Sequence, residues 1–237
     1  MKPIDIVALF LISAVCAGAA PFQNLGFDEA VTNNLVPTDP RERPIYGDGL
    51  GPPEEMMPGW HMFLGTNSIS SIGLNLTPPG YGYATLISAN PPQLGFVLPV
   101  EGLYSLDMLP GSHPITLLQI GEIPTGSKSI QFLSYGSPVQ LEVSGSLVPL
   151  FYTPLPFDPR IPDYNQPSIA MGDISPFAGQ NVELKFIAIS EFNQNPYHGL
   201  DSISFSPLAI PEPAGVALLS IGLLLLCLPR LCRKRGP

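Results

Sequence analysis

The segment Val182-Glu183-Leu184-Lys185-Phe186 alternates apolar and charged side chains with a period of two residues. In an extended strand this alternation places the valine, leucine and phenylalanine on one face and the two charged residues on the other. Near the end of the chain, Ile203 and Phe205 alternate with serines in the same way. Both segments therefore predict β-strands that bury one face and expose the other.

Short segments of β-forming residues recur along the chain, and proline or glycine turns separate them. With 30 prolines and 23 glycines among 237 residues, a helical bundle is excluded, because proline cannot continue a helix and glycine weakens one. The sequence predicts an all-β ectodomain at residues 20–206, a β-sandwich or jelly roll, with residues 32–58 as an ordered surface loop or lid. We expect strands at residues 60–64, 69–76, 83–88, 94–98, 102–108, 115–120, 129–134, 139–143, 182–190 and 200–206.

Charge and cysteine positions exclude several classes of function. Between Ala20 and Ile210, five basic residues stand against seventeen acidic ones, a balance of −12. This sign excludes nucleic acid as a partner, because a nucleic-acid-binding domain needs positive charge to displace phosphate counterions. The three cysteines, Cys16, Cys227 and Cys232, all lie in the apolar termini. The body therefore has no disulfide, no cysteine-ligated zinc and no thiol nucleophile.

Residues 1–19 have the features of a secretory signal peptide. Lys2 supplies positive charge, an apolar stretch follows, and Ala17-Gly18-Ala19 offers the small residues that signal peptidase reads. The alternative is an N-terminal membrane helix, but about ten apolar residues are too few to cross a bilayer. We expect export through the Sec translocon, with cleavage by signal peptidase near Ala19 or Ala20.

The C-terminal residues 207–237 combine three features in order. Pro211-Glu212-Pro213 precedes an uncharged apolar segment, for which we expect a transmembrane helix at residues 214–229. About fifteen apolar residues give a helix of roughly 22 Å, shorter than a hydrocarbon core of about 30 Å, so this anchor in the inner membrane is marginal. A basic tail follows, and the positive-inside rule keeps it cytoplasmic and leaves the body outside. The basic residues are Arg230, Arg233, Lys234 and Arg235.

This tail resembles the PEP-CTERM sorting signal of bacteria, in which a Pro-Glu-Pro motif, one hydrophobic helix and an arginine-rich end follow each other. Pro211, Glu212 and Pro213 match the motif, and the resemblance covers residues 211–235. It implies that an exosortase, a membrane transpeptidase, recognises the tail, and that the protein belongs to the envelope, the cell surface or an exopolysaccharide matrix. The alternative is a plain C-terminal anchor in which proline only starts the helix.

The body resembles the galactose-binding-like jelly rolls found among PEP-CTERM proteins and carbohydrate-binding modules. The resemblance rests on Asn24-Leu25-Gly26-Phe27-Asp28, on the segments 119–132 and 172–186, and on Leu200-Asp201-Ser202-Ile203-Ser204-Phe205. It implies a structural calcium ion bound by Asp28 (or Glu29) and Asp201, because calcium prefers carboxylate and carbonyl oxygens. Ser202 stands where a second acidic residue is frequent. The alternative is that both aspartates are solvated charges or turn caps.

Aromatic side chains offer candidate positions for a sugar, whose CH face packs on a ring while its hydroxyls need polar partners. Trp60, Tyr81 and Tyr83 are the candidate ligand-binding residues, with the alternative that Trp60 is a core residue. Phe151 and Tyr152 lie beside turns, where rings are more often exposed.

The sequence shows no recognisable catalytic motif. The histidines have no metal-ligand spacing, and a Gly-x-Ser-x-Gly nucleophile elbow is missing. We therefore expect an exported protein that is not an enzyme, with a structural or adhesive role and weak carbohydrate binding, exopolysaccharide being the partner. The alternative is a secreted hydrolase that acts on polysaccharide and is anchored at the envelope.

Overall fold

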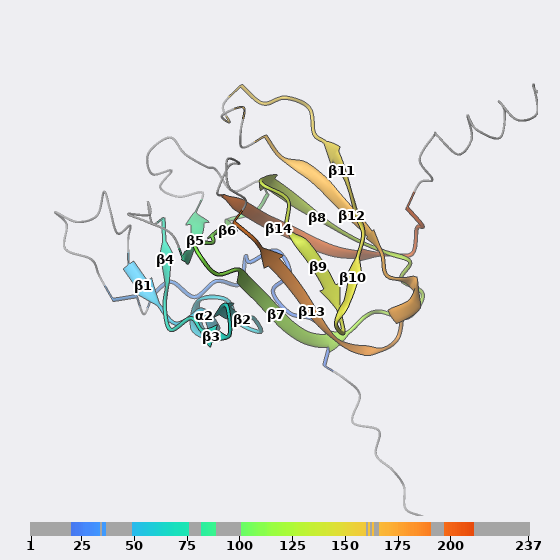
Figure 1. Cartoon of the computed structure of the whole chain (residues 1–237), viewed down its shortest axis with the longest axis horizontal. Coiled ribbons are helices and arrows are strands. Elements are labelled where there is room, and N and C mark those ends of the chain that lie inside the picture. Colours follow the sequence, from blue (N-terminus) through green and yellow to red (C-terminus); the bar gives the residue numbers. More distant parts are fainter. Residues whose placement is uncertain are drawn as a thin grey trace, which may run out of the picture.

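The computed structural model describes residues 20–33, 35–36, 49–75, 82–88, 101–159, 161, 163, 166–190 and 197–210. Within these ranges the chain is mostly β-strand, and the strands form two sheets that enclose one hydrophobic core (Figure 1). The predicted all-β class is confirmed at this level. The predicted signal peptide, the segment 214–229 and the predicted strand 94–98 lie outside the described residues.

The larger sheet has eight strands, and its last strand in sequence lies at its centre. All neighbouring strands are antiparallel except β4 and β5, which are parallel. In spatial order the strands are β1 (Gly49–Gly51), β4 (Ile72–Leu74), β5 (Tyr83–Ser88), β6 (Tyr104–Leu109), β14 (His198–Ser206), β8 (Ser129–Gly136), β12 (Ser168–Asp173) and β11 (Leu150–Pro154).

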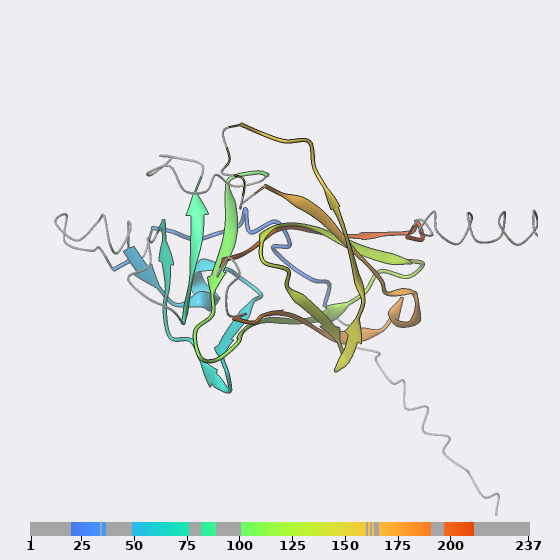
Figure 2. The same ribbon diagram turned by 45° about the horizontal axis from the view of Figure 1, so that its top comes forward.

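The smaller sheet has six strands and forms the second layer, which is seen best in Figure 2. Its order is β10 (Ser146–Val148), β9 (Gln140–Val143), β13 (Asn181–Ala188), β7 (Ile115–Glu122), β2 (His61–Leu64) and β3 (Asn67–Ser68). One α-helix, α2 (Pro53–Met56), and one 3-10 turn, η2 (Ser175–Phe177), complete the described elements.

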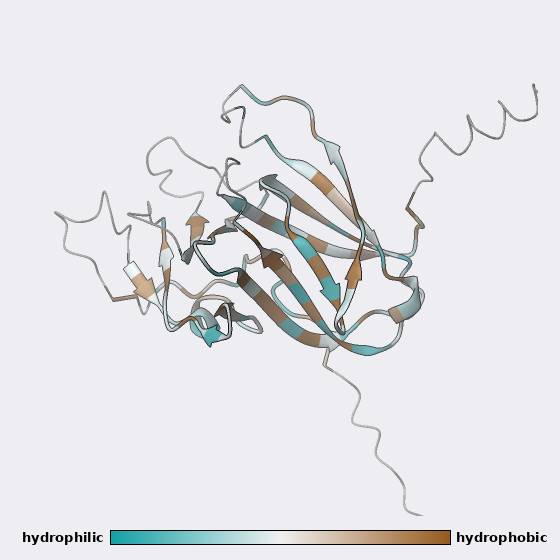
Figure 3. Ribbon diagram, viewed as in Figure 1, coloured by the Kyte–Doolittle hydropathy of each residue, from teal (hydrophilic) through white to brown (hydrophobic). Residues whose placement is uncertain are grey.

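The period-two alternation that predicted β13 produces the core. Val182, Leu184 and Phe186 are buried, while Glu183 and Lys185 are half-buried on the outer face. Apolar and polar bands alternate along the strands of this sheet (Figure 3). Phe186 meets Phe132 of the larger sheet edge to face, with ring centroids 5.1 Å apart. An edge-to-face pair of buried rings thus joins the two layers at their centre.

The structure corrects the predictions in two places. Part of the segment 32–58, expected to be a surface loop or lid, forms β1 and α2, and Met56 and Met57 are 1% and 0% exposed in the core. Proline at the start of α2 pre-sets the backbone angle of a first helical turn, so proline there begins an element. The strands β10, β11 and β12 were not predicted, because glycine, serine and proline interrupt their apolar pattern.

Both ends of the described domain lie at the same end of the sandwich. The backbone N–H of Glu122 donates to Ala20 O at 3.0 Å, which ties the first residues to the end of β7. The hydroxyl of Ser129, the first residue of β8, donates to Leu208 O at 2.8 Å, which ties the last residues to the loop that follows β7. Among the described residues no helix is long and apolar enough to cross a membrane.

Candidate functional site

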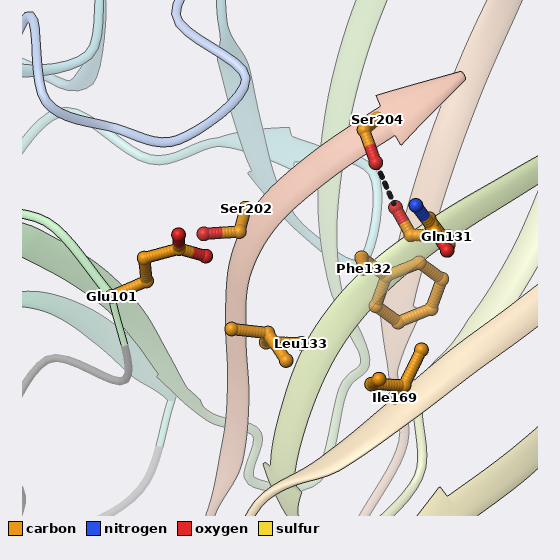
Figure 4. A pocket seen from close by; sticks show the side chains of 7 residues that line it. All are labelled: Glu101, Gln131, Phe132, Leu133, Ile169, Ser202 and Ser204. Atoms are coloured by element: carbon orange, nitrogen blue, oxygen red, sulfur yellow. Dashed lines mark hydrogen bonds between the residues drawn. The ribbon is translucent and has the colours of Figure 1, made fainter. Parts of the chain in front are cut away.

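A shallow pocket of about 200 Å³ lies on the outer face of the larger sheet. It crosses three neighbouring strands, β14, β8 and β12, and the segment before β6 closes one side (Figure 4). The residues that line it are Glu101, Gln131, Phe132, Leu133, Ile169, Ser202 and Ser204.

The pocket has an apolar floor and a polar rim. Leu133 of β8 and Ile169 of β12 are register partners, so their half-buried side chains lie next to each other on the outer face. Beside them, the Ser204 hydroxyl donates to Gln131 O at 3.5 Å (Figure 4). Aliphatic floor and polar rim together are the arrangement that a ligand with one apolar face and several hydroxyls requires.

A β-bulge in β14 shapes the rim. The register with β8 shifts between Asp201 and Ser204, and Ser202 has a φ of +50°. The extra residue bends the strand locally, and the side chains of Ser202 and Ser204 both face the pocket (Figure 4). The bulged strand is held from the other side by a hydrogen bond from the Ile203 N–H to Leu25 O at 3.0 Å.

Two carboxylates hold the segment 101–104, which carries Glu101 to the pocket. Asp201 Oδ2 accepts a hydrogen bond from the Glu101 N–H at 2.9 Å. Asp28 Oδ1 accepts hydrogen bonds from the N–H groups of Leu103 at 2.6 Å and Tyr104 at 3.3 Å. The Glu101 side chain remains exposed, and its carboxylate faces the Ser202 hydroxyl in Figure 4. We call this arrangement the 101–104 clamp.

The two predicted calcium ligands, Asp28 and Asp201, are thus brought to one segment but act there as acceptors of backbone N–H groups. Asp201 is 0% exposed, and its Oδ1 also accepts the Ser202 N–H at 2.7 Å. Within the described ranges no group of three or more histidine, cysteine or acidic side chains could hold a metal ion. Calcium takes six to eight oxygens, so this donor set does not fit a calcium cage as it stands. The calcium site stays a prediction.

Burial determines the protonation of Asp201. Loss of solvent raises the pKa of its carboxyl from 3.8 to about 7, although the N–H groups of Glu101 and Ser202 act in the opposite direction. The charge of Asp28 raises this pKa further. The clamp therefore contains one carboxyl that titrates near neutral pH.

A second group of polar residues lies on the same sheet face, and the sequence did not reveal it. Asp107 of β6, Gly199 of β14 and Tyr135 of β8 are register partners in one row. The Tyr135 ring lies against Gly199, where a Cβ would collide with it. Asp107 Oδ1, the Tyr135 hydroxyl and the Ser105 hydroxyl are buried together at this row, and the Ser105 side chain acts on the Tyr135 hydroxyl. Burial raises the pKa of Asp107 to about 7 and, with the charge of Asp107, raises that of Tyr135 well above its usual value.

The candidate aromatic residues are placed differently from the prediction. Trp60 is 0% exposed, and its Nε1–H donates to Asn24 O at 3.0 Å. The prediction that Trp60 binds a sugar is wrong, since the ring has no free face and packs against Phe27 in the core. Tyr83 is half-buried at the start of β5, and Tyr81 lies outside the described residues.

Phe151 supplies an exposed ring on the pocket face. It is 47% exposed on β11, in agreement with its predicted position beside a turn. Phe151 pairs with Met171 of β12, and Met171 pairs with Gln131 of β8. Because register partners project to the same face, the ring and the pocket share one surface.

Comparison of the chain with protein-family models, with curated proteins and with solved structures gives no match. The sorting motif Pro211, Glu212 and Pro213 and the basic tail lie outside the described residues. Of the described residues that line the pocket, Glu101 alone is acidic or basic, and the neighbouring Asp201 carboxyl is fully buried. Among the described residues that line the pocket there is thus one carboxylate and not the pair that a glycosidase of the two-carboxylate type uses.

Proposed function

We propose that this chain is an exported bacterial protein of the cell surface or extracellular matrix, sorted by its PEP-CTERM tail and recognised by an exosortase. The β-sandwich, with a galactose-binding-like jelly roll as its proposed fold, is the extracellular module. Its role is structural or adhesive, and its outer sheet face binds exopolysaccharide weakly.

The observation that supports this topology best is the shared position of the two chain ends. The predicted signal peptide precedes Ala20 and the predicted membrane segment follows Ile210. Residues next to both points are tied to the same end of the sandwich, through Glu122 and Ser129. Two hydrophobic segments that leave from one end can enter one bilayer while the sandwich stays on a single side of it.

The pocket supports the binding role. An aliphatic floor of Leu133 and Ile169 matches the CH face of a sugar ring, and the rim offers an amide, hydroxyls and a carboxylate for its hydroxyl groups. The pocket is shallow and open, which suits one unit of a long polymer. Many weak contacts along a polymer give useful adhesion through multivalency.

Mass spectrometry of the native protein tests the sorting proposal. The product isolated from the source bacterium should begin near Ala20 and end at or near Pro211–Pro213 when the exosortase gene is intact. In cells without that gene, and in a variant with all three motif residues replaced by alanine, the C-terminus should extend to Pro237. A C-terminus at Pro237 in both strains would reject processing and leave a plain anchor. A soluble intracellular product that retains residues 1–19 would reject export.

Binding of the full-length chain to the polysaccharide of the same bacterium tests the adhesive role. Leu133→Ala should weaken binding at least threefold, because it removes half of the floor. Ile120→Ala is the control, since Ile120 is an apolar residue exposed on β7 of the smaller sheet, away from this pocket. Equal loss in both variants, or no binding by the wild type, would remove the carbohydrate-binding role without affecting the sorting result.

A further inference from the structure

We propose that the outer-face pocket selects an amino sugar with a free, protonated amine, and that Glu101 is its anionic partner. This inference rests on the proposed carbohydrate binding and adds the chemical class of the sugar. It follows from the charge of the pocket, the fixed backbone at Glu101 and the apolar path that leads from the pocket to Phe151.

The pocket and its surroundings carry negative charge. Glu101 is the sole acidic or basic residue among the described residues that line the pocket, and it is exposed. The carboxylates of Asp28 and Asp201 hold the segment behind it. Between Ala20 and Ile210 the chain carries five basic and seventeen acidic residues. The summed field therefore attracts a cation and repels an acidic sugar such as a uronate.

The second step is preorganisation. The N–H of Glu101 is fixed by Asp201, and the next residue, Gly102, has a φ of +65° and no room for a Cβ because the Asp28 carboxylate lies against it. The backbone at Glu101 thus has little freedom to lose when a ligand binds. The fixed backbone keeps the exposed Glu101 side chain beside the pocket, so only the side chain itself has to be ordered when a charge-assisted hydrogen bond forms.

The third step is shape. The pocket of about 200 Å³ is smaller than the sites of drug-sized ligands, which begin at about 300 Å³, and it has room for a single sugar ring. Leu133 and Ile169 form a flat aliphatic floor under the ring. Gln131 and the serines of the bulge lie at its edge (Figure 4). The ring is therefore expected to lie flat, with its amine toward Glu101.

The fourth step is a path for the rest of the polymer. From Gln131 the row continues through Met171 to Phe151, which is 47% exposed. Two strand spacings separate Gln131 from Phe151, about 10 Å. A chain that crosses the strands can therefore place one ring over Glu101 and a later ring on Phe151, where CH–ring packing adds to affinity.

Calorimetric titration with two matched oligosaccharides tests the inference. The probes are a glucosamine tetramer and an N-acetylglucosamine tetramer, used below the pKa of the glucosamine amine and at low salt. The full-length chain is kept in a detergent without a sugar headgroup. We expect the glucosamine tetramer to bind at least tenfold more tightly than the acetylated one, and Glu101→Gln to abolish this preference. Glu55→Gln, which removes an exposed carboxylate from α2, should leave the preference intact.

Two further measurements separate a built site from general attraction between an acidic protein and a polycation. Phe151→Ala should weaken the glucosamine tetramer but not the monosaccharide. A lysine tetramer of equal charge should not displace the sugar. Displacement by the lysine tetramer, or equal loss in Glu55→Gln and Glu101→Gln, would overturn the inference.

Three further binding results would each decide whether the pocket selects a free amine. Equal affinity for both tetramers would overturn the amine selectivity and leave the proposed carbohydrate binding in place. Failure of both tetramers to bind while the native polysaccharide still binds would overturn the inference alone. Failure of every sugar to bind would remove the proposed binding role as well. Thermal denaturation serves as the folding control. If Glu101→Gln has the same Tm as the wild type, any loss of sugar binding comes from the missing charge.

Discussion

The rings of Phe22 and Phe205 lie with their centroids 5.3 Å apart, tilted by 34°. One belongs to the first segment of the described domain and the other to its last strand, so this contact closes the sandwich at the end where both chain ends leave. Bringing together residues so far apart in sequence costs more loop-closure entropy than a local contact, so the packing of the two rings has to offset that cost.

Phe205→Ala should therefore lower the free energy of unfolding by about 1–3 kcal/mol, since it removes a partly buried ring and its aromatic partner. Urea denaturation of the full-length chain measures this change. Phe157→Ala is the control, because Phe157 is 65% exposed and its loss should be close to neutral. Equal effects of the two substitutions would contradict the structural role of the ring pair.

Gly199→Ala should destabilise the protein by about 1–3 kcal/mol, because the new methyl group would enter the space of the Tyr135 ring. Gly26→Ala is the matched control, since the nearest atom to its added Cβ is 3.9 Å away. The double variant Gly199→Ala with Tyr135→Phe should remain destabilised, because the ring and not its hydroxyl causes the collision. A neutral Gly199→Ala would show that the sheet face is looser at this row than the structure indicates.

The protein should lose stability as the pH rises from about 4 to about 7. In the folded state burial raises the pKa of Asp107 from 3.8 to about 7. Across that range the unfolded chain therefore releases its proton while the folded one retains it, and unfolding is favoured. Asp201, whose pKa is also raised to about 7, acts in the same direction.

Asp107→Asn removes one of these titrations, so its Tm should exceed that of the wild type at pH 8 and approach it at pH 5. Thermal denaturation across this pH range measures the difference. Asp163→Asn, at an exposed position, serves as the control and should leave the wild-type profile unchanged. A wild-type Tm that rises steadily from pH 5 to pH 8 would contradict the burial of these carboxyls.

Removal of the Asp28 carboxylate should release the 101–104 clamp. In Asp28→Ala the N–H groups of Leu103 and Tyr104 lose their acceptor, so their hydrogen exchange should be at least tenfold faster. Glu29→Ala changes the adjacent exposed residue and should have no such effect. Unchanged exchange at Leu103 in Asp28→Ala would mean that other contacts hold the segment.

If Asp28 and Asp201 serve only as acceptors of backbone N–H groups, calcium should not alter the stability of the protein. A specific site filled at one hundred times its dissociation constant would add about 2.7 kcal/mol. Thermal denaturation with millimolar calcium and with a chelator distinguishes the two situations. A Tm that increases with calcium and loses that dependence in Asp201→Asn would restore the calcium site predicted from sequence.

The sequence predicted strands correctly where apolar and charged residues alternate with a period of two. In the segment 182–186 of β13 the three apolar residues are buried and the two charged ones lie on the outer face, so period-two alternation identified the strand. In β12, Ser168-Ile169-Ala170-Met171-Gly172-Asp173 lacks this contrast, because its outer face carries the half-buried Ile169 and Met171. A strand whose outer face carries apolar residues does not have the pattern of a strand whose outer face carries charge.

The site was only partly predictable for a related reason. Asp28 and Asp201 were expected to lie together as calcium ligands, but their hydrogen bonds to the segment 101–104 were not predicted. The N–H groups that they accept belong to the backbone and have no sequence signature. Asp107 alternates with Leu106 and Met108 as a solvated residue would, yet it is 6% exposed. Whether an outer face is covered depends on tertiary structure, so alternation alone could not identify this buried carboxyl.

The hydrogen bond from the Ser129 hydroxyl to Leu208 O holds the chain against the domain up to Leu208, so the segment between the domain and the sorting motif is very short. From Leu208 to Pro211 an extended chain reaches no farther than about 10 Å. On the proposed topology, a protease that cuts at the motif would therefore have to work within about 10 Å of the folded domain. The released product would then end only a few residues after the folded domain, and it would offer other proteases very little unfolded chain to cleave.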